Sequence, residues 1–466
     1  MKQHKIRHID FENGSILKCI LQNALPLLAA QILNLLYSIV DRIYIARIPS
    51  AGTSAISAVG LCFPVIILIS AFTNLYGSGG SPLLSIAYGE GDTKKAQLIL
   101  NLSLRLEILT AAALMLLGEV FCTPLLRLFG ASSVTLPYAQ SYLRIYLLGT
   151  LFSMIAAGMN PFINAQGFPV IGMTTVMIGA LCNIILDPVF IFRFGMGIRG
   201  AAWATVLSQA LSALFVLRFL SSGSATMRLT HMPLREMLRY GRQIRNIVSL
   251  GFAAFVMQVT NSLVSVACNG VLSQCGGDLY IGIMTIITSI RQIMDTPIFA
   301  IADGSSPVIS YNYGARRPRR VISSIRILTI LGFAYTIAAW IFMMTNTAFV
   351  IRIFSSDQAL LSAGIPAVQL YFSAFVFQTF QYAGQTVFKS LGKKKQAIFF
   401  SLLRKVVIVI PLTYLLPFAF HMGSRGVFLA EPVSNVIGGL ACFITMLLTV
   451  MPELRRMEKE QITAQS

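Results

Sequence analysis

Twelve long apolar stretches constrain the fold of this chain more than any other feature of its sequence. A bilayer core about 30 Å thick is crossed by roughly 20 apolar residues of helix. The stretches are continuous, whereas a membrane β-barrel would show short alternating strands. We therefore predict an all-α membrane protein with twelve transmembrane helices. The predicted spans are residues 20–46, 55–80, 98–120, 137–161, 168–192, 198–220, 246–272, 279–305, 323–345, 358–386, 398–420 and 426–451.

The composition excludes the soluble classes of protein. Only 11% of the 466 residues are charged and 56% are hydrophobic, whereas soluble domains carry about 25% charged residues. The seven cysteines lie in or beside apolar stretches and form no C-x-x-C pair. They are expected to be buried small residues, with no disulfide framework or zinc site. No short apolar core is followed by a small-residue cleavage site, so we expect no removable signal peptide.

The net charge of +19 is explained by topology. Twelve spans place both termini on one side, and the runs 228–245, 316–320 and 393–395 concentrate basic residues on that side. Such runs can bind anionic lipid or nucleic acid, but the excess of Lys and Arg in cytoplasmic loops already accounts for them. We predict cytoplasmic termini, a bacterial cytoplasmic membrane location and no nucleic-acid partner.

The second half of the sequence repeats motifs of the first half, in order and at a nearly constant offset. The motif Ser81-Pro82-x-x-Ser85-x-x-Tyr88-Gly89 recurs as Ser306-Pro307-x-x-Ser310-x-x-Tyr313-Gly314, and Arg199-Gly200 recurs as Arg425-Gly426. Gln31, Asn34 and Ser38 recur as Gln258, Asn261 and Ser265. We predict an N-lobe (1–220), a basic cytoplasmic linker (221–243) and a C-lobe with a tail (244–466). Parallel repeats of this kind place the substrate path of a transporter between the halves.

Two acids stand out inside spans of the first half. Asp41 shares one helix face with Gln31, Asn34 and Ser38, and Asp187 lies one helical turn after Asn183. A charge within a span costs on the order of 2.5–3.5 kcal/mol and usually marks a cavity or a partner. With Asn183 and Thr205, the two acids offer oxygen ligands for Na⁺, or they can exchange a proton. The structural alternative is that Asp41 pairs with Arg42 or Arg47 and that Asp187 caps a helix break at Pro188.

The second half lacks this pair of acids. The repeat partner of Asp41 is Cys268, and that of Asp187 lies near Leu412, which favours an ion site confined to the first half. Arg291 and Asp295 stand one helical turn apart and are expected to pair. Glu431 aligns with Thr205, and it can bind a cation or the transported substrate.

Polar and flexible side chains define the expected substrate cavity. Methionine and aromatic residues suit a pocket that accepts many apolar or cationic shapes, although most of them are expected to pack or to face lipid. The predicted cavity residues are Gln31, Asn34, Tyr37, Ser38, Met159, Met257, Gln258, Asn261 and Glu431, with Asn160 beside them.

No catalytic motif is present in the sequence. There is no G-x-x-x-x-G-K-[ST], H-E-x-x-H or G-x-S-x-G, so we expect neither an enzyme nor an ATP-driven pump. We expect no cofactor, and the energy source is then an ion gradient of H⁺ or Na⁺.

The ordered motifs resemble the multidrug and toxic compound extrusion (MATE) family, over essentially the whole chain. The motifs are Pro26-x4-Gln31, Tyr37-x2-Val40-Asp41, Gly80-Ser81-x3-Ser85-x3-Gly89, Asn160-x5-Gln166-Gly167, Asn183-x3-Asp187-Pro188, Gly200-Ala201-Ala202-x-Ala204-Thr205 and Ala430-Glu431-Pro432. The resemblance implies two six-helix lobes around a V-shaped central cavity. It also implies export of cationic or amphipathic drugs in exchange for H⁺ or Na⁺.

In the prokaryotic branch of that family, an N-lobe cation site is similar to Asp41, Asn183, Asp187 and Thr205, with Asn160 nearby. Bending of the first helix at a proline matching Pro26 is proposed to couple protonation to release. Arg42, directly after Asp41, departs from this scheme because its charge can keep Asp41 ionised. The chain is expected to act as a monomer on drug-like molecules in the bilayer. A flippase for a lipid-linked precursor has a related architecture and is the alternative.

Overall fold

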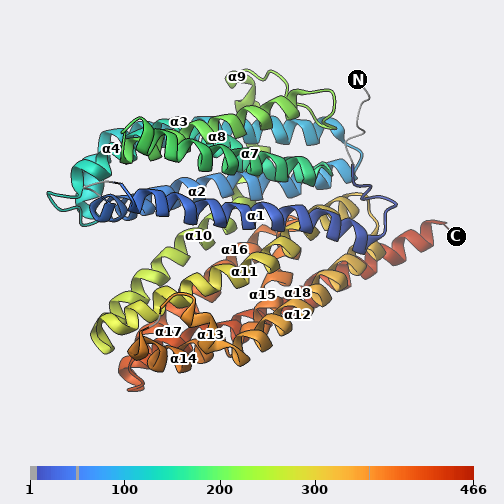
Figure 1. The fold of residues 1–466 in the computed structure, drawn as a ribbon. Helices are drawn as coiled ribbons and strands as arrows, with labels where there is room; N and C mark the ends of the chain where they lie inside the picture. Colours follow the sequence, from blue (N-terminus) through green and yellow to red (C-terminus); the bar gives the residue numbers. More distant parts are fainter. Residues whose placement is uncertain (1–7, 49–51, 356, 466) are drawn as a thin grey trace. The chain divides into compact units, whose positions relative to one another are not determined.

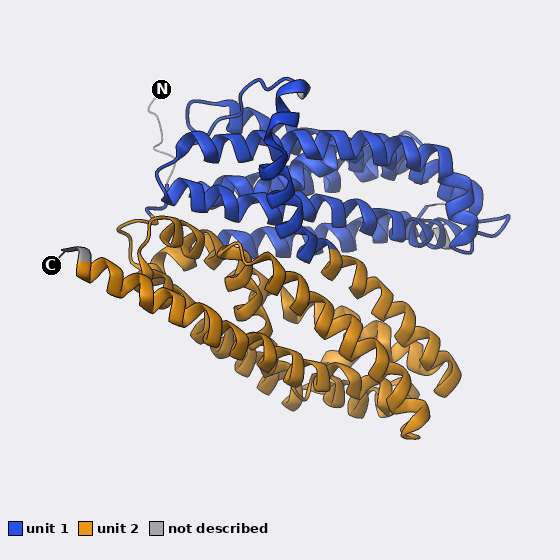
Figure 2. Ribbon diagram, turned by 180° about the vertical axis from the view of Figure 1, so that it is seen from behind, with its two compact units in different colours: residues 1–10, 25–255 blue, residues 11–24, 256–466 orange. Residues whose placement is uncertain are grey.

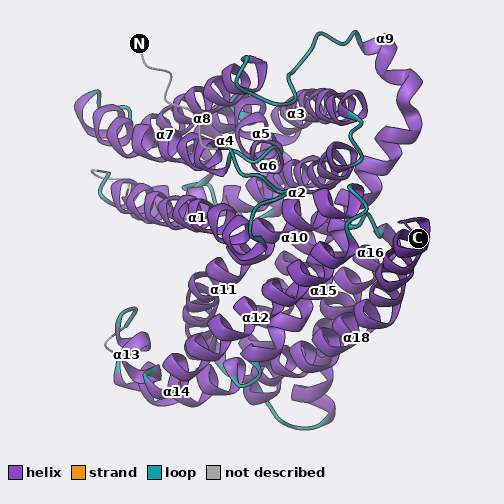
Figure 3. Ribbon diagram, turned by 90° about the vertical axis from the view of Figure 1, so that its right-hand side faces the viewer, coloured by secondary structure: helices purple, strands orange, loops and turns teal. Residues whose placement is uncertain are grey.

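The computed structural model describes residues 8–48, 52–355 and 357–465, and these residues form helices and connecting loops without a β-strand (Figures 1 and 3). The first half contains α1 (Ile16–Ala46), α2 (Gly52–Gly89), α3 (Thr93–Leu128), α4 (Leu136–Leu148), α5 (Thr150–Gly158), α6 (Asn160–Ala165), α7 (Pro169–Pro188), the π-helical turn η1 (Val189–Arg193) and α8 (Ile198–Ser221).

The second half follows a similar order of elements. It contains α9 (Leu234–Met237), η2 (Leu238–Tyr240), α10 (Gly241–Cys275), α11 (Gly277–Gly314), α12 (Pro318–Thr345), α13 (Thr347–Arg352), α14 (Gln358–Phe372), η3 (Phe375–Phe377), α15 (Gln378–Ser390), α16 (Lys394–Leu402), η4 (Leu403–Val409), α17 (Ile410–Tyr414), η5 (Leu415–Ala419) and α18 (Ser424–Gln465). Each of the twelve predicted spans falls on one helix or on a run of adjoining helices.

These helices confirm a multi-pass, all-α membrane protein. In the described residues, ten helices are long and apolar enough to cross a membrane. The pair Leu136–Leu148 and Thr150–Ala165, bent by 56°, makes an eleventh. The remaining predicted span is α11, which carries Arg291, Asp295 and Asp303 along its 38 residues. Charged side chains make this helix less apolar than the others, so length and hydropathy alone do not identify it as a membrane span.

The turns of the backbone repeat as the sequence does. Arg316 and His421 have positive φ angles of 53° and 54°, a conformation that favours glycine. Each corresponds to a glycine of positive φ in the first half. The four pairs are Gly91 and Arg316, Gly167 and Gly392, Gly195 and His421, and Gly197 and Gly423. Both members of each pair occupy the same place in the repeat, so the helices of both halves end in the same way.

The chain divides into two compact units (Figure 2). Unit 1 comprises the N-terminal residues up to Asp10 and Leu25–Phe255, and unit 2 comprises Phe11–Ala24 and Val256–Ser466. Each has its own hydrophobic core. The predicted linker, 221–243, lies within unit 1, and the division falls inside α1 and α10.

Close contacts to other helices accompany the division of the first helix of each repeat. Asn23 Nδ2 donates to Gly304 O at 3.3 Å, which ties the start of α1 to α11. In unit 1, a Cβ on Gly251 of α10 would lie 1.7 Å from Leu75 O. Only glycine permits this approach of α10 to α2.

Candidate cation site

Three helices of unit 1 bring together the acids and amides predicted from the sequence. Asn183 lies on α7 and donates through Nδ2 to Asp187 Oδ1, one turn later, at 3.4 Å. The same nitrogen lies 3.3 Å from Thr205 Oγ1 on α8. Asp41, near the end of α1, lies within hydrogen-bonding reach of Asp187. The four residues therefore form one polar site inside the first lobe.

Three oxygen atoms of this site are buried without a hydrogen-bond partner. They are Asp41 Oδ1, Asp187 Oδ2 and Asn183 Oδ1. Asp187 is completely buried and Asn183 is 2% exposed. A buried acceptor that bonds to nothing is costly. Unpaired oxygens from three residues, together with a threonine hydroxyl, match the hard ligands that Na⁺ takes or the acceptors that a proton requires.

Two carboxyl groups at hydrogen-bonding distance cannot both remain charged without a compensating cation. Asp41 forms no ion pair with Arg42, whose guanidinium lies 5.0 Å from the centre of the Phe63 ring, although the charge of Arg42 acts on Asp41. None of the ion pairs between described residues involves Asp41. Asp187 does not cap a break, since the chain continues past Pro188 into η1.

A cavity of about 150 Å³ lies beside the site. Asn34, Tyr37, Asn183 and Thr205, all predicted, contribute to its wall. The other polar residues of the wall were not predicted from the sequence, and they are Ser153, Ser208, Gln209 and Ser212. This volume suits a few water molecules, and the cavity reaches the site through Asn183 and Thr205.

Asn160 is bonded to other groups. Its Nδ2 donates to Gly172 O at 2.8 Å and to the Thr175 hydroxyl, and its Oδ1 accepts from Asn164. These bonds tie α6 to α7. Asn160 thus supports the helix that carries Asn183 and Asp187, and these bonds involve none of the four site residues.

The other predicted cavity residues have different environments. Gln31 and Ser38 on α1 and Met257 and Gln258 on α10 are partly exposed, and Asn261 is exposed. Met159, between α5 and α6, is completely buried in the core of unit 1, so its place in a substrate cavity stays a prediction. Pro26 lies inside an uninterrupted α1, so its role as a hinge stays a prediction.

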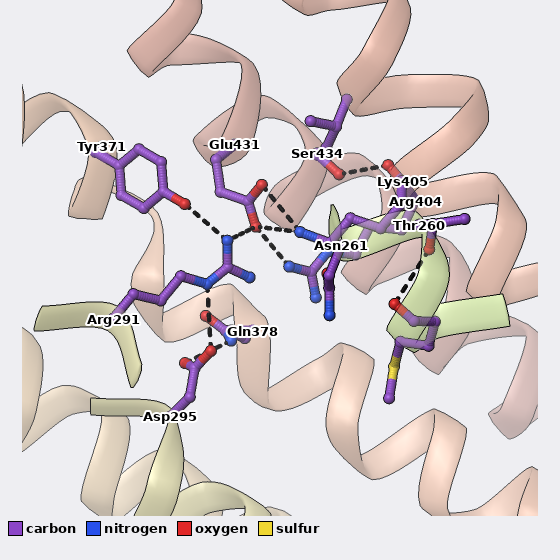
Figure 4. A network of polar contacts seen from close by, with 12 residues as sticks. Thr260, Asn261, Arg291, Asp295, Tyr371, Gln378, Arg404, Lys405, Glu431 and Ser434 are labelled. Atoms are coloured by element: carbon purple, nitrogen blue, oxygen red, sulfur yellow. Dashed lines mark hydrogen bonds and ion pairs between the residues drawn. The ribbon is translucent and has the colours of Figure 1, made fainter. Parts of the chain in front are cut away.

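Glu431 on α18 is not free to bind a cation, as the sequence had suggested, because three basic groups already surround it (Figure 4). Its Oε1 lies 2.8 Å from Arg291 Nη1, 2.6 Å from Arg404 Nη2 and 3.1 Å from Lys405 Nζ. A carboxylate so engaged does not offer a free site for a cation. The predicted pair of Arg291 and Asp295 is confirmed, at 3.2 Å.

Three buried charged residues were not predicted from the sequence. Arg404 and Lys405 lie inside the predicted span 398–420, and each is 5% exposed. Glu107 on α3 is completely buried, and neither of its carboxyl oxygens has a hydrogen-bond partner. All three stand within apolar stretches, and this position is the signal that could have identified them.

The comparisons agree with this architecture. The family model described as MatE matches residues 26–189 and 253–415. The "Multidrug export protein MepA" of Staphylococcus saprophyticus is 24% identical over 443 residues, which cover 94% of this chain and 95% of that protein. The same-named protein of Staphylococcus aureus strain MRSA252 is 23% identical over 441 residues, with the same coverage.

Two solved structures share the fold. One is described as the outward-facing conformation of a multidrug resistance MATE family transporter of the MOP superfamily. It has a TM-score of 0.87 and 22% identity, and the match covers 98% of this chain and 100% of that one. The other is a MOP superfamily transporter from Pyrococcus furiosus, with a TM-score of 0.88, 21% identity and coverage of 98% and 99%.

Proposed function

Because this chain belongs to the MatE family, we propose that it is a secondary active antiporter that exports cationic or amphipathic compounds in exchange for H⁺ or Na⁺. The observation that carries the proposal is the site of Asp41, Asn183, Asp187 and Thr205, with three unpaired buried oxygens. The chain also resembles multidrug export proteins over 94% of its length.

The residues of unit 1 have distinct roles in this proposal. Asp41 and Asp187 bind the coupling ion, which neutralises two acids that burial and mutual repulsion otherwise disfavour. Asn183 orients Asp187 and Thr205, and the adjoining cavity supplies the route to solvent. Ion entry and drug exit alternate, so the ion gradient drives export. No reactive cluster or nucleotide is needed.

The proposal includes a bacterial cytoplasmic membrane location, cytoplasmic termini and a monomer. The basic runs between spans support the orientation, as the positive-inside rule requires. A flippase for a lipid-linked precursor is not favoured, because the matched relatives are multidrug export proteins.

Ethidium efflux from proteoliposomes tests the function under separately imposed H⁺ and Na⁺ gradients. The wild-type chain is expected to export ethidium with one gradient, which names the ion, and Asp41→Asn is expected to export none. Arg127→Gln is the matched control, because Arg127 is an exposed basic residue in the last turn of α3. Efflux by Asp41→Asn at the wild-type rate would refute the site. Failure of the wild-type chain with both gradients would refute the function.

A further inference from the structure

The core of unit 2 contains five charged side chains that do not balance. Arg291, Arg404 and Lys405 are basic, whereas Glu431 and Asp295 are the acids that pair with them. Three positive charges against two negative charges leave one in excess. We propose that this C-lobe cluster binds the anionic group of a small amphipathic molecule, such as a carboxylate.

Burial makes the excess charge significant. Glu431 is 4% exposed, Asp295 is 6% exposed, and Arg404 and Lys405 are each 5% exposed. An unpaired charge at this depth is destabilising, and intramembrane charges normally mark a partner or a pathway. Arg291, whose side chain is 19% exposed, is the most accessible member of the cluster. Arg291 is therefore the member of the cluster that an anion would contact first.

The cluster also has more donors than acceptors. Arg291 donates to Asp295 and to the Tyr371 hydroxyl and pairs with Glu431 (Figure 4). The second oxygen of Asp295 is already taken by Gln378 Nε2 at 2.8 Å. Lys405 uses both oxygens of Glu431, and Arg404 Nε is buried with no partner. Since neither guanidinium nor ammonium accepts a hydrogen bond, a ligand that brings acceptor oxygens would satisfy these donors.

The repeat places this cluster at the position of the N-lobe cavity. Four residues of the cavity wall correspond to four members of the C-lobe network. Gly179 corresponds to Lys405, Thr205 to Glu431, Ser153 to Gln378 and Ala157 to Tyr382. One fold position thus holds small side chains and a cavity in the first lobe and a charged, hydrogen-bonded network in the second.

The positive sign of the excess charge favours an anionic ligand over a cationic one. A cation would meet three bases, whereas a carboxylate can take two N–H groups from a guanidinium and a third from Lys405. A lipid phosphate shares this chemistry. The N-lobe acids already provide for a cation, so the C-lobe cluster widens the ligand range to anionic and zwitterionic amphiphiles. This inference concerns binding and holds whether or not ion coupling follows the proposal above.

Fluorescence titration of dansylglycine against the full-length protein in neutral detergent micelles tests the inference. The matched neutral ligand is dansylglycinamide, which differs only in lacking the carboxylate. The acid is expected to bind about tenfold more tightly or better, the usual effect of hydrogen bonds to a charged group. Equal affinity of acid and amide for the wild-type protein would overturn the proposal without any variant.

Variants of Lys405 test whether the acid binds at the C-lobe cluster. Lys405→Gln removes the excess charge and should abolish the preference for the acid, whereas Lys405→Arg should keep it. Arg425→Gln, which removes an exposed basic residue of α18, is the control and should bind as the wild type does. An unchanged preference in Lys405→Gln would refute the assignment to this cluster. Stoichiometric displacement of the probe by phosphatidylglycerol, but not by phosphatidylcholine, would assign the cluster to a lipid headgroup and contradict the small-molecule ligand.

Discussion

The two lobes use the same helix positions for opposite electrostatics. In the first lobe, Asp41 on α1 meets Asp187 on α7. In the second lobe, the corresponding residues are Cys268 on α10 and Thr413 on α17, which lie 3.9 Å apart. The pairing of the helices is thus preserved, while two acids are replaced by a thiol and a hydroxyl.

The surroundings of these two pairs also differ in charge. The N-lobe site has unpaired oxygens and a cavity of about 150 Å³. In the C-lobe, long basic side chains join Glu431 in an ionic network. A repeated backbone therefore sets where a site can be, and a few side chains decide which charge it attracts.

The largest expected effect is the loss of coupling in Asp187→Asn. The amide keeps the size of the side chain, but it cannot release a proton or balance a cation. Ion-driven ethidium efflux should fall to the level of empty proteoliposomes, and the protein should remain monodisperse on size exclusion. The matched substitution at the repeat position, Thr413→Val, should retain efflux. Equal losses in both variants would mean that the lobes do not differ in ion binding.

Much of this contrast can be predicted from the sequence. The apolar stretches predict the helices, and the constant offset between the repeated motifs predicts the repeat of the turns at Gly91 and Arg316. Asp41, Asn183 and Asp187 can be found because spacing along a helix determines which residues share a face.

The partners of Glu431 could not be predicted in this way. They come from α11 and η4, which precede α18 in the chain and are separated from it by further helices or turns. Helix packing alone decides that these side chains converge. Met159 is buried where α5 ends and the span bends. Helical periodicity assumes a straight helix, so it does not predict which way a residue at a bend faces.

Glu431→Gln should destabilise the protein by about 3–5 kcal/mol, because it leaves buried basic groups without their shared counter-ion. Thermal unfolding in detergent should show a lower midpoint than the wild type. The matched change in the other lobe is Thr205→Val, which removes one hydroxyl and should cost about 1 kcal/mol.

The double variant Glu431→Gln, Lys405→Met sharpens this test. It restores the charge excess of the wild type and should recover part of the lost stability. No recovery would mean that geometry, and not charge balance, determines the cost of losing Glu431.

Asn183→Leu should weaken binding of the coupling ion roughly tenfold, because Asn183 is hydrogen-bonded to Asp187 and Thr205 and contributes an unpaired oxygen. The half-saturating ion concentration for efflux should rise, with little change in the maximal rate. Thr174→Val on the same helix is the control, since the Thr174 hydroxyl donates only to Val170 O of its own helix. An equal shift in the control would place the effect in α7 as a whole.

The last prediction concerns a buried pair that contains an acid in the first lobe and only small residues in the second. Glu107 and Gly158 pack together in unit 1, and a Cβ on Gly158 would lie 2.2 Å from Glu107 Oε1. Their partners in the repeat are Gly332 and Ala383, so both positions carry a small residue in the second lobe. Gly158→Ala should therefore cost about 1–3 kcal/mol through overpacking.

The variant Glu107→Gly, Gly158→Ala reproduces the C-lobe pair and should recover part of that loss in thermal unfolding. If the double variant is less stable than either single variant, the buried carboxyl of Glu107 contributes more to the lobe than its volume. The difference between the lobes would then include the buried acid Glu107 in addition to the two charged sites.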